Sequence, residues 1–145
     1  MKKVAVYAAM LIASMMTVSH LNAQQQCFDG NLQGAYSFEA SGTFNGSPFA
    51  AAGQTLYDGN GHAEGVIQAS SGGTVYPPAL WTATYSVGPI TTSSGFAVCV
   101  LTKTITIPSY GMTISFFGTP GDGFTSLRFI ATTSGATISG TAKKQ

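Results

Sequence analysis

Four polar residues at alternate positions form the densest group of chemically active side chains in the sequence. They are Asp58, Asn60, His62 and Glu64. This spacing is typical of a calcium loop, but an EF-hand needs glycine at its sixth place and glutamate at its twelfth, where this sequence has Ala63 and Ala69. A zinc site needs three or four ligands, and one histidine follows residue 23. We therefore predict no metal site and interpret the segment as a turn leading into a polar strand face.

The same histidine would be the base of any Ser-His-Asp triad, with Asp58 or Asp122 to orient it. No Gly-x-Ser-x-Gly nucleophile motif accompanies it. Paired carboxylates for glycoside hydrolysis would have to come from five scattered acidic residues, of which Glu39 and Glu64 fall on the polar faces of predicted strands. The sequence therefore predicts a protein that is not an enzyme and that needs no cofactor.

Aromatic residues are the remaining candidates for a binding site, because they recur on the apolar side of alternating segments. If those segments are strands of one closed sheet, the aromatic side chains share its interior. The predicted inner face consists of Tyr36, Phe38, Phe44, Trp81, Tyr85, Phe116 and Phe129. Such residues form either an ordinary packed core or an apolar pocket, and an enclosed cavity of about 300 Å³ or more would favour the pocket.

Apolar and polar residues alternate with a period of two through most of the chain after residue 23. In one segment, Trp81, Ala83, Tyr85 and Val87 alternate with Thr82, Thr84 and Ser86. The pattern predicts strands at residues 36–44, 49–57, 62–70, 81–87, 96–107, 112–116, 124–132 and 136–142. No segment after residue 23 has apolar residues at helical spacing over ten residues, so we predict an all-β protein.

Short turn sequences separate these segments. Asn45-Gly46 is a strong hairpin signal, and Asp58-Gly59-Asn60-Gly61 joins the next two strands. Short connections predict an antiparallel meander of about eight or nine strands, which closes most naturally into an up-and-down barrel. A two-sheet β-sandwich is the alternative, and only residues 74–79 and 88–95 are long enough for its crossovers.

The first 23 residues have the layout of a secretory signal peptide. Lys2 and Lys3 precede an apolar run over residues 4–18, and a polar stretch ends at Ala23, the predicted cleavage point. The run of about 15 residues is shorter than the roughly 20 that cross a bilayer. We expect residues 24–33 to form an N-terminal segment and residues 34–145 a single barrel domain. The protein would be secreted or periplasmic, where Cys27 and Cys99 would form a disulfide.

Charge is scarce throughout the chain, at 8% of residues. After residue 23 the positive residues are Lys103, Arg128, Lys143 and Lys144, and the negative ones are Asp29, Glu39, Asp58, Glu64 and Asp122. Four minus five gives a net charge of −1, too little positive charge to neutralise many phosphates. We therefore expect no nucleic-acid partner. We also expect no transmembrane segment after residue 23, and the oligomeric state stays open.

Several motifs of the sequence occur together in one family. Cys27 precedes Leu32-Gln33-Gly34-Ala35-Tyr36-Ser37-Phe38, Gly53 precedes Asp58-Gly59-Asn60-Gly61, and the chain ends with Gly140-Thr141-Ala142-Lys143-Lys144-Gln145. In these features the chain resembles small exported bacterial β-barrel proteins. Gly34-Ala35-Tyr36 is also distantly similar to the Gly-x-Trp opening of lipocalins. The resemblance implies a calycin-like barrel and brings no established activity.

Two functions remain compatible with the sequence. The first is non-enzymatic binding of a small apolar ligand in the barrel interior, which the aromatic inner face favours. The alternative is a structural or cell-surface interaction protein with a filled barrel core and an exterior rich in serine and threonine.

Overall fold

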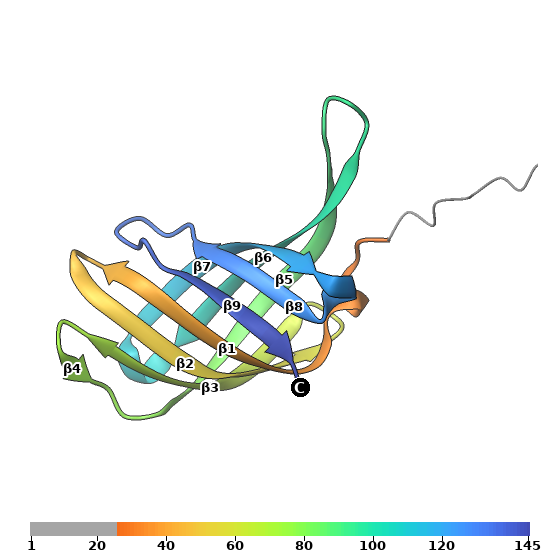
Figure 1. The fold of residues 1–145 in the computed structure, drawn as a ribbon. Helices are drawn as coiled ribbons and strands as arrows, with labels where there is room; N and C mark the ends of the chain where they lie inside the picture. Colours follow the sequence, from red (N-terminus) through yellow and green to blue (C-terminus); the bar gives the residue numbers. More distant parts are fainter. Residues whose placement is uncertain (1–25) are drawn as a thin grey trace, which may run out of the picture.

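Nine antiparallel strands form one sheet in the computed structural model, which describes residues 26–145 (Figure 1). The strands are β1 (Gln33–Phe44), β2 (Ser47–Asp58), β3 (His62–Ser71), β4 (Thr74–Val75), β5 (Ala79–Thr91), β6 (Ala97–Ile107), β7 (Met112–Gly121), β8 (Ser126–Ala131) and β9 (Ser139–Lys144). Three short 3-10 helices, η1 (Asp29–Asn31), η2 (Pro108–Tyr110) and η3 (Asp122–Phe124), lie between them. Within residues 26–145, no helix has the length and hydropathy needed to cross a membrane. The signal peptide predicted at residues 1–23 lies outside the described residues.

The sheet closes on itself. Its strand order is β2-β1-β9-β8-β7-β6-β5-β3-β4, and a further pairing between β2 and β3 joins the two sides into a ring of eight strands. The short strand β4 pairs with the end of β3 outside that ring. The predicted up-and-down barrel is thus confirmed, and the β-sandwich alternative is not the fold of this chain. Short connections between successive strands leave room only for neighbour pairing.

The first hairpin shows how turn chemistry fixes the register. Asn45 and Gly46 both have positive φ angles, 49° and 80°, as a two-residue type I′ turn requires. They place Phe44 opposite Ser47, and the register then continues without interruption to Gln33 opposite Asp58.

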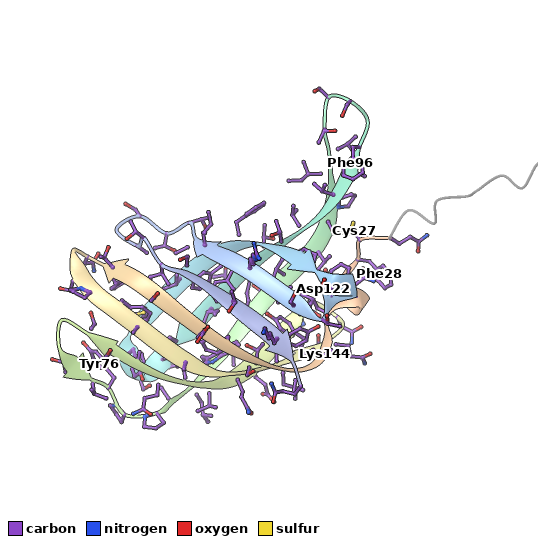
Figure 2. The ribbon with its side chains drawn as sticks, in the orientation of Figure 1. Cys27, Phe28, Tyr76, Phe96, Asp122 and Lys144 are labelled. Atoms are coloured by element: carbon purple, nitrogen blue, oxygen red, sulfur yellow. A yellow bond between two sulfur atoms is a disulfide. The ribbon has the colours of Figure 1, made fainter. Side chains whose placement is uncertain are left out.

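Residues 88–95 were expected to form a connection, but the first four of them belong to strand β5. Strand β5 continues to Thr91 and pairs with β6 beyond the barrel, with Ile90 opposite Val98. The result is a hairpin arm, residues 88–100, that projects from one end of the barrel (Figures 1 and 2). Its β-branched residues favour continued pairing over a loop. Phe96 and Ile90 on this arm are 67% and 48% exposed, so the arm carries apolar surface that the barrel does not cover.

A disulfide ties the N-terminal segment to the base of this arm. Cys27 and Cys99 are bonded, with their Cα atoms 5.3 Å apart and a sequence separation of 72 (Figure 2). This confirms the predicted pairing.

In three of the cross-strand pairs of glycine with a large aromatic residue, the aromatic ring lies directly against the glycine. The cross-strand pairs are Phe38 with Gly53, Trp81 with Gly65, and Phe129 with Gly140. A Cβ atom added at any of these glycines would lie within 3.0 Å of the partner ring. The missing side chains therefore let the rings lie against the neighbouring backbone, an arrangement that supports the strong curvature of a small barrel.

We predict that Gly65→Ala lowers the free energy of unfolding by about 2 kcal/mol, because overpacking forces the surrounding chain to shift. The new Cβ would lie 1.9 Å from the carbonyl oxygen of Gln54 and 2.6 Å from Cζ2 of Trp81. Urea unfolding followed by circular dichroism measures the change. Gly88→Ala is the matched control, since no atom lies within 4 Å of its added Cβ, and it should be neutral or slightly stabilising. Equal effects of the two substitutions would contradict the packing argument.

Candidate functional site

The barrel interior holds a cavity of about 60 Å³. Aromatic and aliphatic residues from seven of the eight ring strands make most of its wall, including Phe38, Phe49, Ile67, Leu101, Ile114, Phe116, Leu127, Phe129 and Ile138. Its polar lining residues are Thr55, Tyr57 and Lys103. The volume is far below the roughly 300 Å³ at which ordinary ligand pockets begin, so side chains fill most of the interior.

Lys103 is the unexpected member of this wall. Strand β6 alternates, with Thr102 and Thr106 exposed on the outside and Leu101 buried on the inside, and Lys103 shares the inward face. Only 8% of the residue is exposed. The register of β6 thus places a primary amine among aromatic rings inside the barrel.

Three aromatic contacts surround the amine. Lys103 Nζ donates a hydrogen bond of 3.0 Å to the hydroxyl oxygen of Tyr57. It also lies 4.7 Å from the centroid of the Tyr57 ring and 4.4 Å from that of Trp81. Aromatic faces attract cations, so these contacts offset part of the free energy lost when the ammonium leaves water.

No carboxylate neutralises this amine among the described residues. The ion pair found within residues 26–145 is an exposed one between His62 and Asp58, 3.9 Å apart. Burial without a counter-ion disfavours the charged form and lowers the pKa of Lys103 to about 7. Near neutral pH, about half of the molecules therefore carry a neutral amine inside the barrel.

Trp81 adds an unsatisfied donor to the same neighbourhood. The residue is 2% exposed, and its indole Nε1 has no hydrogen-bond acceptor among the described residues. A buried N–H without an acceptor costs about 1–3 kcal/mol. The ring that faces Lys103 thus also carries a polar group that lacks a partner.

Three tyrosines close one end of the barrel beside this site. Tyr57 makes edge-to-face contacts with Tyr36 and Tyr85, at centroid distances of 5.2 and 5.0 Å. Tyr85 donates to the backbone oxygens of Asp29 and Leu32, and Tyr36 donates to the backbone oxygen of Phe124. These bonds fix η1 and η3 across the end of the barrel. Burial raises the pKa of each tyrosine, so all three stay protonated at neutral pH.

The seven aromatic residues proposed from the sequence take different places. Phe38, Phe116 and Phe129 line the cavity. Tyr36 and Tyr85 anchor the closed end, and Trp81 stacks on Lys103. Phe44 does not line the cavity, and its ring lies 6.5 Å from that of Phe49.

Lys103 and Tyr57 are the site residues that the sequence reasoning missed. A signal for Lys103 existed, because Thr102, Thr104 and Thr106 alternate as an outer strand face and place the residues between them inside. A similar alternation from Phe49 onward places Tyr57 inside, where it is 3% exposed.

The Asp58 segment is a turn, as interpreted from the sequence. Asp58 Oδ1 accepts hydrogen bonds from the backbone N–H groups of Asn60 and His62, at 2.7 and 3.0 Å. These bonds lower the pKa of the Asp58 carboxyl. Glu64 follows on an exposed position of β3. Within residues 26–145, no group of three or more His, Cys, Asp or Glu side chains could hold a metal ion.

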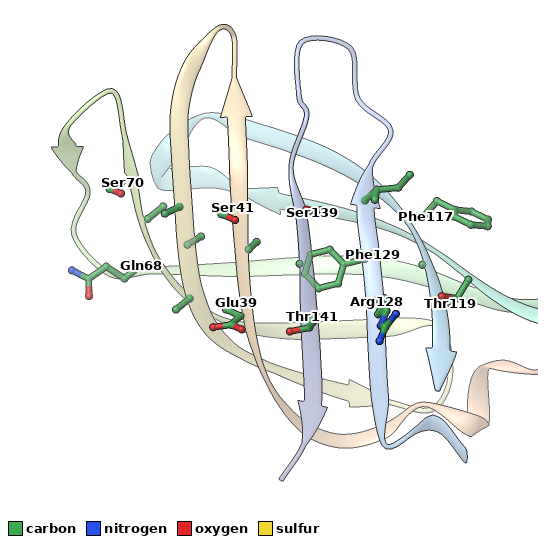
Figure 3. Close-up of a pocket in the computed structure, with 18 of the residues that line it drawn as sticks. Glu39, Ser41, Gln68, Ser70, Phe117, Thr119, Arg128, Phe129, Ser139 and Thr141 are labelled. Carbon is green, nitrogen blue, oxygen red and sulfur yellow. The ribbon is translucent and has the colours of Figure 1, made fainter. Parts of the chain in front are cut away.

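A second hollow, of about 1070 Å³, lies open on the barrel wall (Figure 3). The strand register aligns its lining in two adjacent rows across six strands. One row is Gln68, Ala52, Glu39, Thr141, Arg128 and Thr119, and the other is Ser70, Ala50, Ser41, Ser139, Ile130 and Phe117. The lining residues on β2 and β9 are alanine, serine, glycine and threonine, whereas Glu39 on β1 and Phe117 on β7 carry larger side chains.

The fold and the interior together define a small up-and-down β-barrel that contains a buried amine with no counter-ion among residues 26–145. Comparison of the chain with protein-family models, with curated proteins and with solved structures gives no match. The resemblance to small exported barrel proteins and to lipocalins therefore rests on the sequence motifs alone.

Proposed function

We propose that this protein binds a small, mainly apolar molecule inside the barrel without transforming it, and that the polar end of the ligand meets Lys103. The observation that carries this proposal is the burial of an amine without a counter-ion among the described residues. A buried charge costs several kcal/mol, and an apolar residue of similar volume would fill the same space without that cost. Packing alone therefore gives no reason for lysine at this position.

The donors at the site define the polar end of the ligand. Lys103, Tyr57 and Thr55 line the cavity and can each donate a hydrogen bond, so they favour an oxygen acceptor such as a carboxylate or a carbonyl. An anionic ligand would also replace the missing counter-ion. The phenylalanine rings of the cavity wall would contact the apolar part of the ligand.

Cavity size limits the ligand to a few non-hydrogen atoms. A volume of about 60 Å³ holds a few water-sized groups, since each needs roughly 10–15 Å³. A fatty acid or another long-chain molecule would have to displace Phe38, Phe116 or Phe129. We therefore propose a short-chain ligand rather than one of the size that lipocalin-like pockets usually take.

An exported location goes with this function. The disulfide between Cys27 and Cys99 is a feature of proteins that fold in oxidising compartments. Together with the predicted signal peptide, it supports a secreted or periplasmic binding protein.

A structural or surface-interaction role is the second candidate. It is favoured by the nearly filled interior and by the hairpin arm, on which Ile90, Phe96 and Val98 are 48%, 67% and 38% exposed. For such a protein, Lys103 would have no part in the function.

Thermal unfolding with short-chain ligands tests the proposed binding and separates it from the second candidate. The probes are butanoate and butan-1-ol, each titrated against the full chain and against Lys103→Met. A ligand at ten times its Kd stabilises a protein by about 1.4 kcal/mol, so the Tm of the unaltered protein should rise with probe concentration. Lys103→Met should lose the response to butanoate. If neither probe nor a wider set of short-chain acids, alcohols and ketones raises Tm, the proposed function is wrong.

A further inference from the structure

We propose that Lys103 captures short-chain aldehydes by forming an imine inside the barrel. This inference rests on the proposed ligand site and names one chemical class of ligand for it. The amine, the cavity and the neighbouring donors are the observations that carry it.

The position of the amine meets the first requirement for imine formation. Lys103 and Tyr57 both line the cavity, and Nζ lies 3.0 Å from the Tyr57 hydroxyl oxygen, so a small carbonyl compound in that space would be within reach of the amine. No carboxylate among the described residues holds the side chain as an ammonium ion. Burial also lowers the pKa of the amine to about 7, which leaves a large neutral fraction with a lone pair free to attack.

The donors beside the amine meet the second requirement, which is control of the carbonyl oxygen. Tyr57 Oη lies 3.0 Å from Nζ, and burial raises the pKa of this phenol, so that it keeps its proton. Thr55, which also lines the cavity, carries a second hydroxyl group. An aldehyde oxygen in the cavity could accept a hydrogen bond from the phenol of Tyr57, which lines it.

The reaction balances without an oxidant or a reductant. The lone pair of Nζ forms a bond to the carbonyl carbon, and a proton moves from nitrogen to oxygen to give a carbinolamine. The phenol of Tyr57 then gives its proton to the departing hydroxyl group, which leaves as water. The remaining nitrogen proton returns to the phenolate, so that aldehyde and amine become a neutral imine and one water molecule.

The apolar wall favours the imine once it has formed. Hydrolysis needs water at the C=N carbon, and the cavity leaves little room for water beside a bound chain. Its volume of about 60 Å³ also selects aldehydes of a few non-hydrogen atoms. Phe38, Phe116 and Phe129 would contact the alkyl group of such a ligand.

Reductive trapping with propanal tests the inference on the full chain. Propanal and cyanoborohydride convert an imine into a stable N-propyl amine, which intact-mass measurement and peptide mapping locate. We expect one propyl group per chain at Lys103, formed more than tenfold faster at pH 7 than at Lys143 or Lys144. Lys143 and Lys144 serve as internal references, because both are exposed on β9.

Two controls keep the outcome decisive. Lys103→Met should remove the fast modification while the slow modification of Lys143 and Lys144 persists. Fast modification at Lys143 and Lys144 in place of Lys103, or equal rates at all three, would overturn the inference. If butanoate and butan-1-ol raise Tm but propanal leaves Lys103 unmodified, aldehyde capture is wrong and the proposed binding function stands. If neither binding nor trapping occurs, both fail.

Discussion

The double substitution Cys27→Ala/Cys99→Ala is expected to lower the free energy of unfolding by about 4 kcal/mol. The disulfide closes a loop with a sequence separation of 72 residues. In the chain-entropy model, a cross-link of that span lowers the conformational entropy of the unfolded chain and so raises its free energy by about this amount. The bond also holds the segment before η1, which lies across the closed end of the barrel. Chemical unfolding in urea measures the change.

A reducing agent provides the matched control for this prediction. The unaltered protein in reductant should approach the stability of the double variant, and the double variant should not respond to reductant. Hydrogen bonds from Tyr85 to the backbone of Asp29 and Leu32 do not involve the cysteines, so η1 should stay in place when the variant is folded. A stability loss below about 1 kcal/mol would show that the cross-link does not restrict the unfolded chain as the model requires.

The second large effect is a rise in stability with pH that depends on Lys103. The pKa of this amine is about 7 in the folded protein and 10.5 in an exposed lysine. Between those values the unfolded chain binds more protons than the folded one, so the free energy of unfolding increases with pH. From pH 6 to pH 10 we expect a gain of about 4 kcal/mol.

The tyrosines set the upper limit of this range. Because burial raises the pKa of Tyr36, Tyr57 and Tyr85, the folded protein keeps phenol protons that the unfolded chain releases above about pH 10. Stability should therefore fall again at higher pH.

Urea unfolding at a series of pH values measures this profile. Lys103→Met keeps an unbranched side chain without the amine, and it should flatten the profile between pH 7 and pH 10 while increasing stability at pH 7. Lys143→Met is the matched control, since Lys143 is exposed, and it should retain the slope of the unaltered protein. A Lys103→Met profile as steep as that of the unaltered protein would refute the assignment of the slope to Lys103.

The barrel could be predicted from local signals because each of its determinants is local. Alternation at Trp81, Ala83 and Tyr85 defines an inner face, and Asn45-Gly46 defines a tight reversal. Repeated along the chain, these two signals lead to a meander. The extension of β5 to Thr91 could not be predicted in the same way, since it consists of pairing with β6 across the hairpin, with Ile90 opposite Val98 and Thr91 opposite Ala97.

The site was predictable only in part, for a different reason. The inward direction of Phe38, Phe116 and Phe129 follows from alternation, but whether they leave a cavity depends on how they pack with Gly53 and Gly140 on neighbouring strands. Composition also misleads at Lys103, because lysine is usually placed on the surface. The position of Lys103 between Thr102 and Thr104 indicated its inward direction better than its residue type did. Its contact with Tyr57 joins β6 and β2, which are not neighbours in the ring, so local sequence could not predict it.

The ring of strands has a consequence for the order in which the chain can fold. The first strand of the chain, β1, pairs with the last strand, β9, with Tyr36 opposite Lys144 and Ser41 opposite Ser139. Contacts between opposite ends of a chain form slowly, because a long loop must close before they contribute. Until β9 docks, β1 and β8 present free edges that can pair with another chain. Deleting residues 139–144, which form β9, should therefore cause aggregation rather than give a smaller barrel. Substitutions in β9 should also change the folding rate more than substitutions in the other strands.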